Sequence, residues 1–113
     1  MSLKLSIRQV GDVTVIDAAG RMTLGEGSSD FRDKIKELTA SGNKRILLNL
    51  GEVNYIDSSG IGELVSSFTS VSTAGGALKL LNLTKRVQDL LQITKLYTVF
   101  EVFDDETSAI RSF

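Results

Sequence analysis

The sequence contains no cysteine and no histidine among its 113 residues. Without cysteine the chain has no disulfide framework and no thiolate to hold a metal ion. Without histidine it has no imidazole to serve as a general base or as a metal ligand. These absences exclude a Ser-His-Asp hydrolase, a Cys-His protease and a typical structural zinc site. Only carboxylates and lysines remain as bases, so we predict no catalytic residue, no metal or cofactor site, and a protein that is not an enzyme.

An excess of positive charge is also missing, because the formal net charge is −1. A nucleic-acid surface normally needs clustered basic residues, so no nucleic-acid partner is expected. Apolar runs are short: those at 46–48 and 99–100 fall far below the roughly 20 residues that span a bilayer. Residues 1–5 show no signal-peptide core. We therefore expect no membrane contact and a cytoplasmic location.

Strand and helix patterns alternate along the chain, which we predict to be one domain over residues 1–113. Near-alternating β-branched residues at 3–10 and 13–18, with Gly11-Asp12 between them, predict a β-hairpin. Strands are predicted at 46–50, 77–83 and 97–103, and helices from a cap at Ser28 or Ser29 to Gly42, from Gly60 to Gly75, over 84–93 and from 104. The order ββαβαβαβα predicts an α/β fold with a single mixed sheet, whose hairpin supplies the antiparallel part.

Residues 49–62 join a strand of continuous apolar residues to the helix with the clearest apolar stripe. In sheets with parallel strands, functional residues concentrate at this edge. The segment Asp57-Ser58-Ser59 stands where the first helical N–H groups lack internal partners, so one of its side chains is expected to cap the helix. Gly60 and Gly62 are expected to leave the exposed side of the first turn bare for a partner's backbone. Taken alone, these residues are more typical of an ordinary capped turn than of a functional site.

The motif Asp57-Ser58-Ser59-Gly60-Ile61-Gly62, preceded by the apolar strand at 46–50, resembles the signature of the STAS domain, in particular that of the bacterial anti-sigma factor antagonists. The resemblance covers essentially the whole chain, including the opening hairpin, the Gly75-Gly76 break and the segment 85–96. It implies a STAS-type fold and a binding module. In that family the serine directly after the aspartate is phosphorylated by the anti-sigma factor, which is itself a kinase. By resemblance that serine is Ser58.

The resemblance implies a switch between partners. The unphosphorylated chain would bind an anti-sigma factor serine kinase and thereby release a sigma factor. Phosphorylation of Ser58 would end that binding, and a protein phosphatase acting on Ser58 would restore it. No cofactor is needed, and the expected form is a monomer or a weak dimer. The residues expected at the partner interface are Arg21, Met22, Thr23, Asp57, Ser58, Ser59, Gly60, Ile61, Gly62 and Ser66.

The helix after the motif carries little charge. Over residues 60–74 only Glu63 is charged. The positions expected to point outward are small and neutral: Gly62, Ser66, Thr69 and Ser70. Solvated helix faces usually carry more lysine and glutamate, so this face is predicted either to dock flatly against a partner or to be ordinary solvated surface. Lys85 and Arg86 are interpreted as a solvated helix start.

The chain departs from the family pattern at one place. The family commonly has Gly-Glu-Leu-Asp at the end of the second strand, where this chain has Gly20-Arg21-Met22-Thr23. Neutral Thr23 replaces an acidic residue, and Arg21 supplies a cation that could pair with a phosphate on Ser58. This departure leaves open an alternative, a STAS scaffold or regulatory subunit of a larger signalling assembly that does not use the switch.

A two-component receiver domain is a rival from another class, because Asp57 also follows a central strand as a phosphoacceptor would. By resemblance, that fold needs an acidic pair after its first strand to hold Mg²⁺. Neither the Gly11-Asp12 hairpin nor the loop at Gly20 supplies such a pair. Contact with a nucleotide or a lipid is a further alternative, which no motif specifies.

Overall fold

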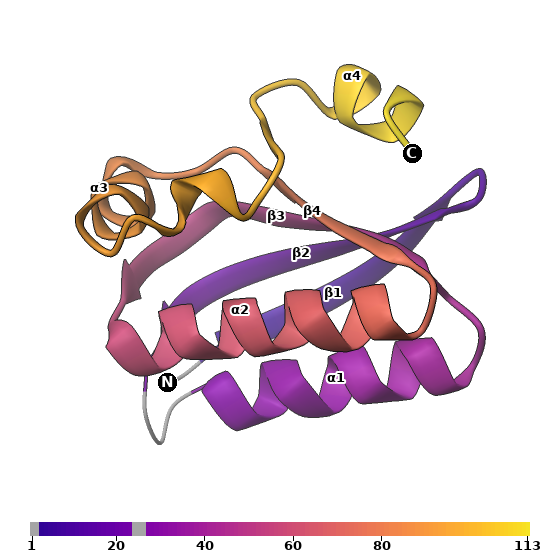
Figure 1. Ribbon diagram of the computed structural model, residues 1–113, viewed down its shortest axis with the longest axis horizontal. Helices are drawn as coiled ribbons and strands as arrows, with labels where there is room; N and C mark the ends of the chain where they lie inside the picture. Colours follow the sequence, from indigo (N-terminus) through magenta and orange to yellow (C-terminus); the bar gives the residue numbers. More distant parts are fainter. Residues whose placement is uncertain (1–2, 24–26) are drawn as a thin grey trace.

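The computed structural model describes residues 3–23 and 27–113 (Figure 1). Its elements follow the predicted order, with a short 3₁₀ helix in addition. They are β1 (Leu3–Val10), β2 (Val13–Met22), α1 (Ser28–Ala40), β3 (Arg45–Ile56), α2 (Ser58–Thr73), β4 (Ala77–Leu81), α3 (Lys85–Ile93), η1 (Leu96–Thr98), β5 (Val102–Phe103) and α4 (Glu106–Arg111). No helix within the described ranges is both long and apolar enough to cross a bilayer.

The strands form one mixed sheet in the order β1-β2-β3-β4-β5. β1 and β2 are antiparallel and pair from Leu3 with Gly20 to Val10 with Val13, so the predicted hairpin is confirmed. The pairs β2–β3, β3–β4 and β4–β5 are parallel. This arrangement confirms the predicted α/β fold with a single mixed sheet.

Helices cover the sheet on both faces. α1 and α2 lie side by side under one face, whereas α4 lies over the other and α3 lies near the carboxyl end of β3 (Figure 1). Alternate residues of β3 enter different cores: Ile46 and Leu48 join the larger one, and Leu47 joins a smaller one with Ala109 of α4. β3 is therefore buried on both faces, as its continuous apolar run predicted.

The first helix is not capped as predicted. α1 begins at Ser28, but its N-cap is Gly27, and neither Ser28 nor Ser29 occupies that place. Gly27 has a φ of 92°, a conformation that favours glycine, and a Cβ there would lie 2.6 Å from the Leu3 Cβ. The chain therefore turns into α1 by backbone conformation and close packing against β1, without a side-chain cap.

The predicted last strand over 97–103 is largely wrong. Residues Leu96–Thr98 form a 3₁₀ helix, and β5 consists only of Val102 and Phe103, paired with Leu80 and Leu81. Lys95 adopts a left-handed conformation with a φ of 61°, which redirects the chain directly after α3. Tyr97 is left 54% exposed. The β-forming residues at 97–99 therefore belong to a turn that does not reach the sheet.

Candidate functional site

The junction between β3 and α2 is fixed by an aspartate cap. Asp57 has an extended backbone at the N-cap of α2, and its Oδ1 accepts a hydrogen bond from the Gly60 N–H at 2.9 Å. Among the three polar residues predicted to compete for this place, Asp57 therefore caps the helix. Ser58 begins α2 and is exposed, and Ser59 is half-buried. The Ser58 hydroxyl thus stands at the surface beside a carboxylate.

Gly60 does not lie where the sequence predicted. It is buried, and a Cβ on it would overlap the Met22 carbonyl oxygen and lie 2.6 Å from the Ile56 Cγ1. The expectation that Gly60 faces a partner's backbone is therefore wrong, since this glycine lets α2 pack closely against the ends of β2 and β3. Gly62 is exposed, and a Cβ there would have no atom within 4 Å. Of the two glycines, only Gly62 leaves open space outside the helix.

The end of β2 meets the start of α2, as the grouping of residues 21–23 with 57–62 predicted. The Asp57 N–H donates to the Met22 carbonyl at 3.4 Å, and Met22 pairs with Ile56 in the sheet. The side chains divide sharply between surface and core. Arg21 is exposed, whereas four predicted interface residues have little or no exposure: Met22, Thr23, Gly60 and Ile61. These four pack beneath the surface of the site.

The outward face of α2 has the predicted composition. Its exposed residues include Gly62, Ser66, Thr69 and Ser70. The one acidic residue of the helix, Glu63, is turned towards α1 and contacts Arg32 at 3.2 Å. The helix therefore presents a small-residue, neutral face that begins beside Ser58. Whether a partner binds there remains a prediction.

A pocket of about 480 Å³ opens next to Ser58, between the end of β3 and one face of α3. It is lined by Tyr55, Ile56, Asp57, Ser58, Arg86, Asp89, Leu90 and Ile93. Arg86 lies with its guanidinium carbon 4.2 Å from the centroid of the Tyr55 ring, and Arg21 lies 4.7 Å from the same ring. The interpretation of Arg86 as merely a solvated helix start missed this contact.

The position of Arg86 follows from the way α3 begins. Thr84 caps the helix, since its hydroxyl oxygen accepts from the Val87 N–H, and the same hydroxyl donates to the Val53 carbonyl of β3. This double contact fixes the first turn of α3 against β3. The signal that could have located Arg86 is topological, because α3 follows a strand parallel to β3 and so begins at the same edge of the sheet.

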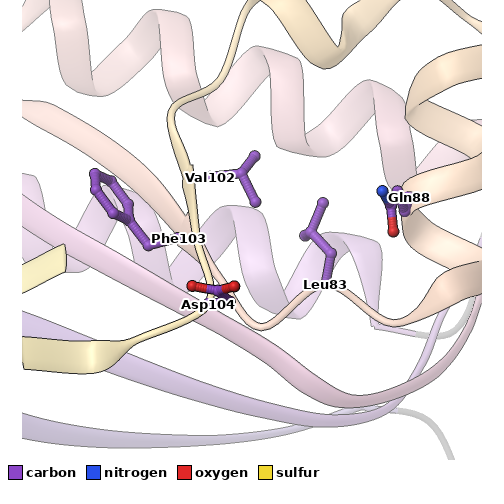
Figure 2. Close-up of a pocket in the computed structure, with 5 residues that line it drawn as sticks. All are labelled: Leu83, Gln88, Val102, Phe103 and Asp104. Atoms are coloured by element: carbon purple, nitrogen blue, oxygen red, sulfur yellow. The ribbon is translucent and has the colours of Figure 1, made fainter. Parts of the chain in front are cut away.

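A second hollow, of about 310 Å³, lies between the start of α3 and β5. Figure 2 shows its lining: Leu83, Gln88, Val102, Phe103 and Asp104. Asp104 is the one charged group among these residues, and no cation or hydroxyl accompanies it. Within the described ranges no three acidic side chains gather to form a metal site either. The pocket at Ser58 is therefore the better candidate for a functional site.

Comparison with known proteins assigns the family. The family model of the STAS domain matches residues 4–109. The anti-sigma-B factor antagonist of Bacillus subtilis (strain 168) is 31% identical over 103 residues, which cover 90% of this chain and 92% of that protein. Both matches extend over nearly the whole chain and include the Asp57-Ser58 junction.

Solved structures show the same fold. An anti-sigma factor antagonist from Mycobacterium paratuberculosis superposes with a TM-score of 0.86 at 14% identity, over 98% of this chain and 93% of that one. The phosphorylated form of the Bacillus cell fate determinant SpoIIAA superposes with a TM-score of 0.75 at 22% identity, over 96% of this chain and 98% of that one. From its sequence match and its fold, the chain is a member of the STAS domain family, of the anti-sigma factor antagonist type.

Proposed function

We propose that this chain binds an anti-sigma factor kinase while Ser58 is unmodified, releases a sigma factor by doing so, and loses the kinase when Ser58 is phosphorylated. The observation that carries the proposal is the exposed Ser58 hydroxyl on a helix already capped by Asp57. Because the cap does not need Ser58, a modification there leaves the helix start intact. The relatives named as antagonists support an anti-sigma factor as the partner.

The modification is a phosphoryl transfer from ATP bound to the kinase. The Ser58 oxygen forms a bond to the γ-phosphorus while the bond from that phosphorus to the ADP oxygen breaks, and the hydroxyl proton passes to a base of the kinase. A protein phosphatase reverses the change by adding water across the serine–phosphate ester, which releases inorganic phosphate and restores the hydroxyl. Neither reaction needs a catalytic group from this chain.

The effect of the phosphate lies at the interface. Phosphorylation adds about −1.5 to −2 charges directly beside the Asp57 carboxylate. A charge left unpaired in an interface costs about 2 to 5 kcal/mol, which corresponds to roughly a 30-fold to several-thousand-fold loss of affinity. At the first residue of α2 the same charge is favoured by the helix dipole, so the domain itself stays folded. The switch therefore changes partners without changing the fold.

Mapping the phosphosite tests the proposal directly. The protein is incubated with candidate anti-sigma kinases and ATP, and the product is analysed by intact mass and by peptide mass spectrometry. We expect one phosphate on Ser58, none in Ser58→Ala, and unchanged modification of Ser59→Ala. Phosphate on another residue would contradict the proposal, and an acid-labile phosphate would place the group on Asp57, as in a receiver domain.

Binding measurements test the interface. Titration calorimetry with the kinase should show an affinity at least about 30-fold lower for phosphorylated protein than for unmodified protein. On the neutral face of α2, Ser66→Lys and Thr69→Lys should also weaken binding. Thr107→Lys is the matched control, because Thr107 is exposed on α4 over the opposite face of the sheet. If the α2 variants bind as tightly as the control, that face is not part of the interface.

A STAS scaffold or regulatory subunit is the second candidate. It is favoured by Thr23, which is neutral and only 7% exposed where the family commonly has an acidic residue. A scaffold would assemble into a large particle, whereas an antagonist is expected as a monomer or weak dimer. Size-exclusion chromatography with mass detection separates these outcomes.

A further inference from the structure

We propose that Arg86 binds the phosphate on Ser58 and leaves the ring of Tyr55 to do so. The inference rests on the proposed function, because it requires a phosphate on Ser58. It adds a residue of the same chain, Arg86, that pairs with the phosphate. It also predicts that phosphorylation changes the surface around the ring of Tyr55.

The first argument is placement. Ser58 and Arg86 line the same pocket of about 480 Å³, which is open to solvent and has room for a phosphate group. Arg86 reaches this pocket because the Thr84 hydroxyl bridges the start of α3 to the Val53 carbonyl, with both of its hydrogen bonds at 3.3 Å. The cation therefore lines the same pocket as the serine before any modification occurs.

The second argument is the bonding state of Arg86. Its observed contact is with the face of the Tyr55 ring, and within residues 3–23 and 27–113 it forms no salt bridge. A cation–π contact at an exposed site is weak. A guanidinium and a phosphate form a bidentate, charge-assisted pair, which is much stronger. Arg86 thus gains by exchanging the ring for the phosphate.

The charges around the pocket favour Arg86 over its neighbours. Asp57 and Asp89 face the pocket with negative charge, and Lys85 is paired with Asp89 at 3.2 Å. Arg21 also lies over the Tyr55 ring, so that ring stays covered by one guanidinium when the other leaves. Of the basic residues near Ser58, Arg86 is the one that lines the pocket. A partner would therefore meet both a new phosphate and an altered ring surface.

Phosphorus NMR tests the pairing. Phosphoserine is incorporated at position 58 by genetic encoding, so the sample does not depend on a kinase. The second pKa of a free phosphoserine is about 6, and a neighbouring guanidinium lowers it. We expect this pKa to be about 0.5 unit higher in Arg86→Gln than in the parent protein, with Arg86→Lys in between because lysine keeps the charge but not the planar fork.

The matched control is Arg45→Gln, which makes the same charge change at the first residue of β3, at the end opposite Ser58. It should leave the phosphoserine pKa unchanged, since Arg45 and Ser58 lie at opposite ends of β3 in a molecule whose longest extent is 30 Å, and the Debye length at physiological salt is only about 8 Å. Circular dichroism confirms that each variant is folded. Equal pKa values in the parent and in Arg86→Gln would overturn the proposal.

Tyrosine fluorescence tests the departure from the ring. The chain has two tyrosines and no tryptophan, so Tyr97→Phe leaves Tyr55 as the only emitter. Phosphoserine at 58 should change the Tyr55 emission when Arg86 is present and leave it unchanged in Arg86→Gln. A pKa shift without an emission change would show that Arg86 binds the phosphate while staying on the ring, which contradicts the second half of the proposal.

The failure of this proposal and the failure of the proposed function can be told apart. If no kinase modifies Ser58, the switch is wrong, although the encoded phosphoserine still reports on Arg86. If the kinase modifies Ser58 but the phosphoserine pKa is the same in Arg86→Gln as in the parent protein, the proposed switch is supported and the proposed role of Arg86 is wrong.

Discussion

Two groups of charged side chains on this sheet are paired in different ways. Between β1, β2 and α4, Arg8 donates hydrogen bonds to both carboxylate oxygens of Asp17 and to both of Glu106. Asn49 of β3 donates to Asp17 as well, at 2.9 Å. We call these four residues the Arg8 cluster. At the other site, beside Ser58, Arg86 lies against an aromatic ring.

The difference distinguishes charged side chains that stabilise the fold, as in the Arg8 cluster, from a charged side chain that is available to bind a new group, as at Arg86. In the Arg8 cluster, hydrogen bonds from Arg8 hold the pKa values of Asp17 and Glu106 below their usual range, against a smaller opposing effect of burial. The same bonds raise the pKa of Arg8. The side chains of this cluster bind one another and so join β1, β2, β3 and α4. At Ser58 a new anion would meet a cation that can move to it.

The largest expected effect concerns the close packing of Gly60 beneath the Ser58 site. Gly60→Ala should lower the free energy of unfolding by about 3 kcal/mol, because the added Cβ overlaps backbone at Met22 and side chain at Ile56. Gly62→Ala is the matched control, with no atom within 4 Å of its Cβ, and should raise stability by about 0.5 to 1 kcal/mol through helix propensity. Urea denaturation measures both. Equal effects would show that α2 does not depend on close packing at Gly60.

The comparison itself can be tested with one kind of substitution at two arginines. Arg8→Gln should cost about 1 to 2 kcal/mol of stability, since it leaves two carboxylates without their shared cation; the estimate is modest because the side chains are 32–40% exposed and solvent screens them. Arg86→Gln should cost about 0.5 kcal/mol, the low end of the range for an exposed cation–π contact. Similar losses at both sites would mean that Arg86 is structural as well.

The contribution of the Arg8 cluster to stability should also depend on pH. Because Asp17 and Glu106 have lowered pKa values in the folded protein, their pairing contributes stability above the ordinary carboxyl pKa of about 4. That contribution is lost as the pH falls from about 5 through the lowered values, when both groups take up protons. Between pH 7 and pH 3 the parent protein should lose about 1 kcal/mol more than Arg8→Gln does. Urea midpoints at the two pH values give this difference, and parallel pH curves would contradict it.

The sequence predicted those features that depend on local spacing. An apolar stripe located α2, formed by Ile61, Leu64, Val65, Phe68 and Val71. Ile61, Leu64 and Val71 are buried, and Val65 and Phe68 are half-buried against the larger core. The polar segment before it located an exposed serine at a helix start. The last strand was mispredicted because the β-forming residues at 97–99 do not indicate the left-handed conformation of Lys95, which turns the chain before it reaches the sheet. A local pattern gives the propensity of a segment, whereas its neighbours decide whether it reaches the sheet.

One feature of the site needed tertiary structure, and a second was misassigned from the sequence. The contact between Tyr55 and Arg86 joins the end of β3 to the start of α3, and only the parallel order of the strands brings them together. Gly60 was assigned to the wrong side of α2, although it lies four residues before Leu64 and so shares the buried stripe. That signal was in the sequence. The glycine was interpreted as an exposed position of the motif, whereas its spacing from Leu64 places it on the buried face of the helix.

The smallest expected effect separates two roles of Asp57, as the cap of α2 and as a charge beside the phosphate. Asn is as good an N-cap as Asp, so Asp57→Asn should change stability by less than about 0.5 kcal/mol, whereas Asp57→Ala should cost about 1 kcal/mol. Removing the carboxylate also removes a like charge, so the second pKa of phosphoserine at 58 should fall by a few tenths of a unit in Asp57→Asn. Urea denaturation and phosphorus NMR measure the two effects on the same variant. A large loss of stability in Asp57→Asn would show that the charge of Asp57 stabilises the start of α2 in addition to the hydrogen bond to Gly60. A phosphate on Ser58 would then compete with a carboxylate that the helix needs, and the contact of Arg86 with Tyr55 would not be enough to explain how the site accepts the second anion.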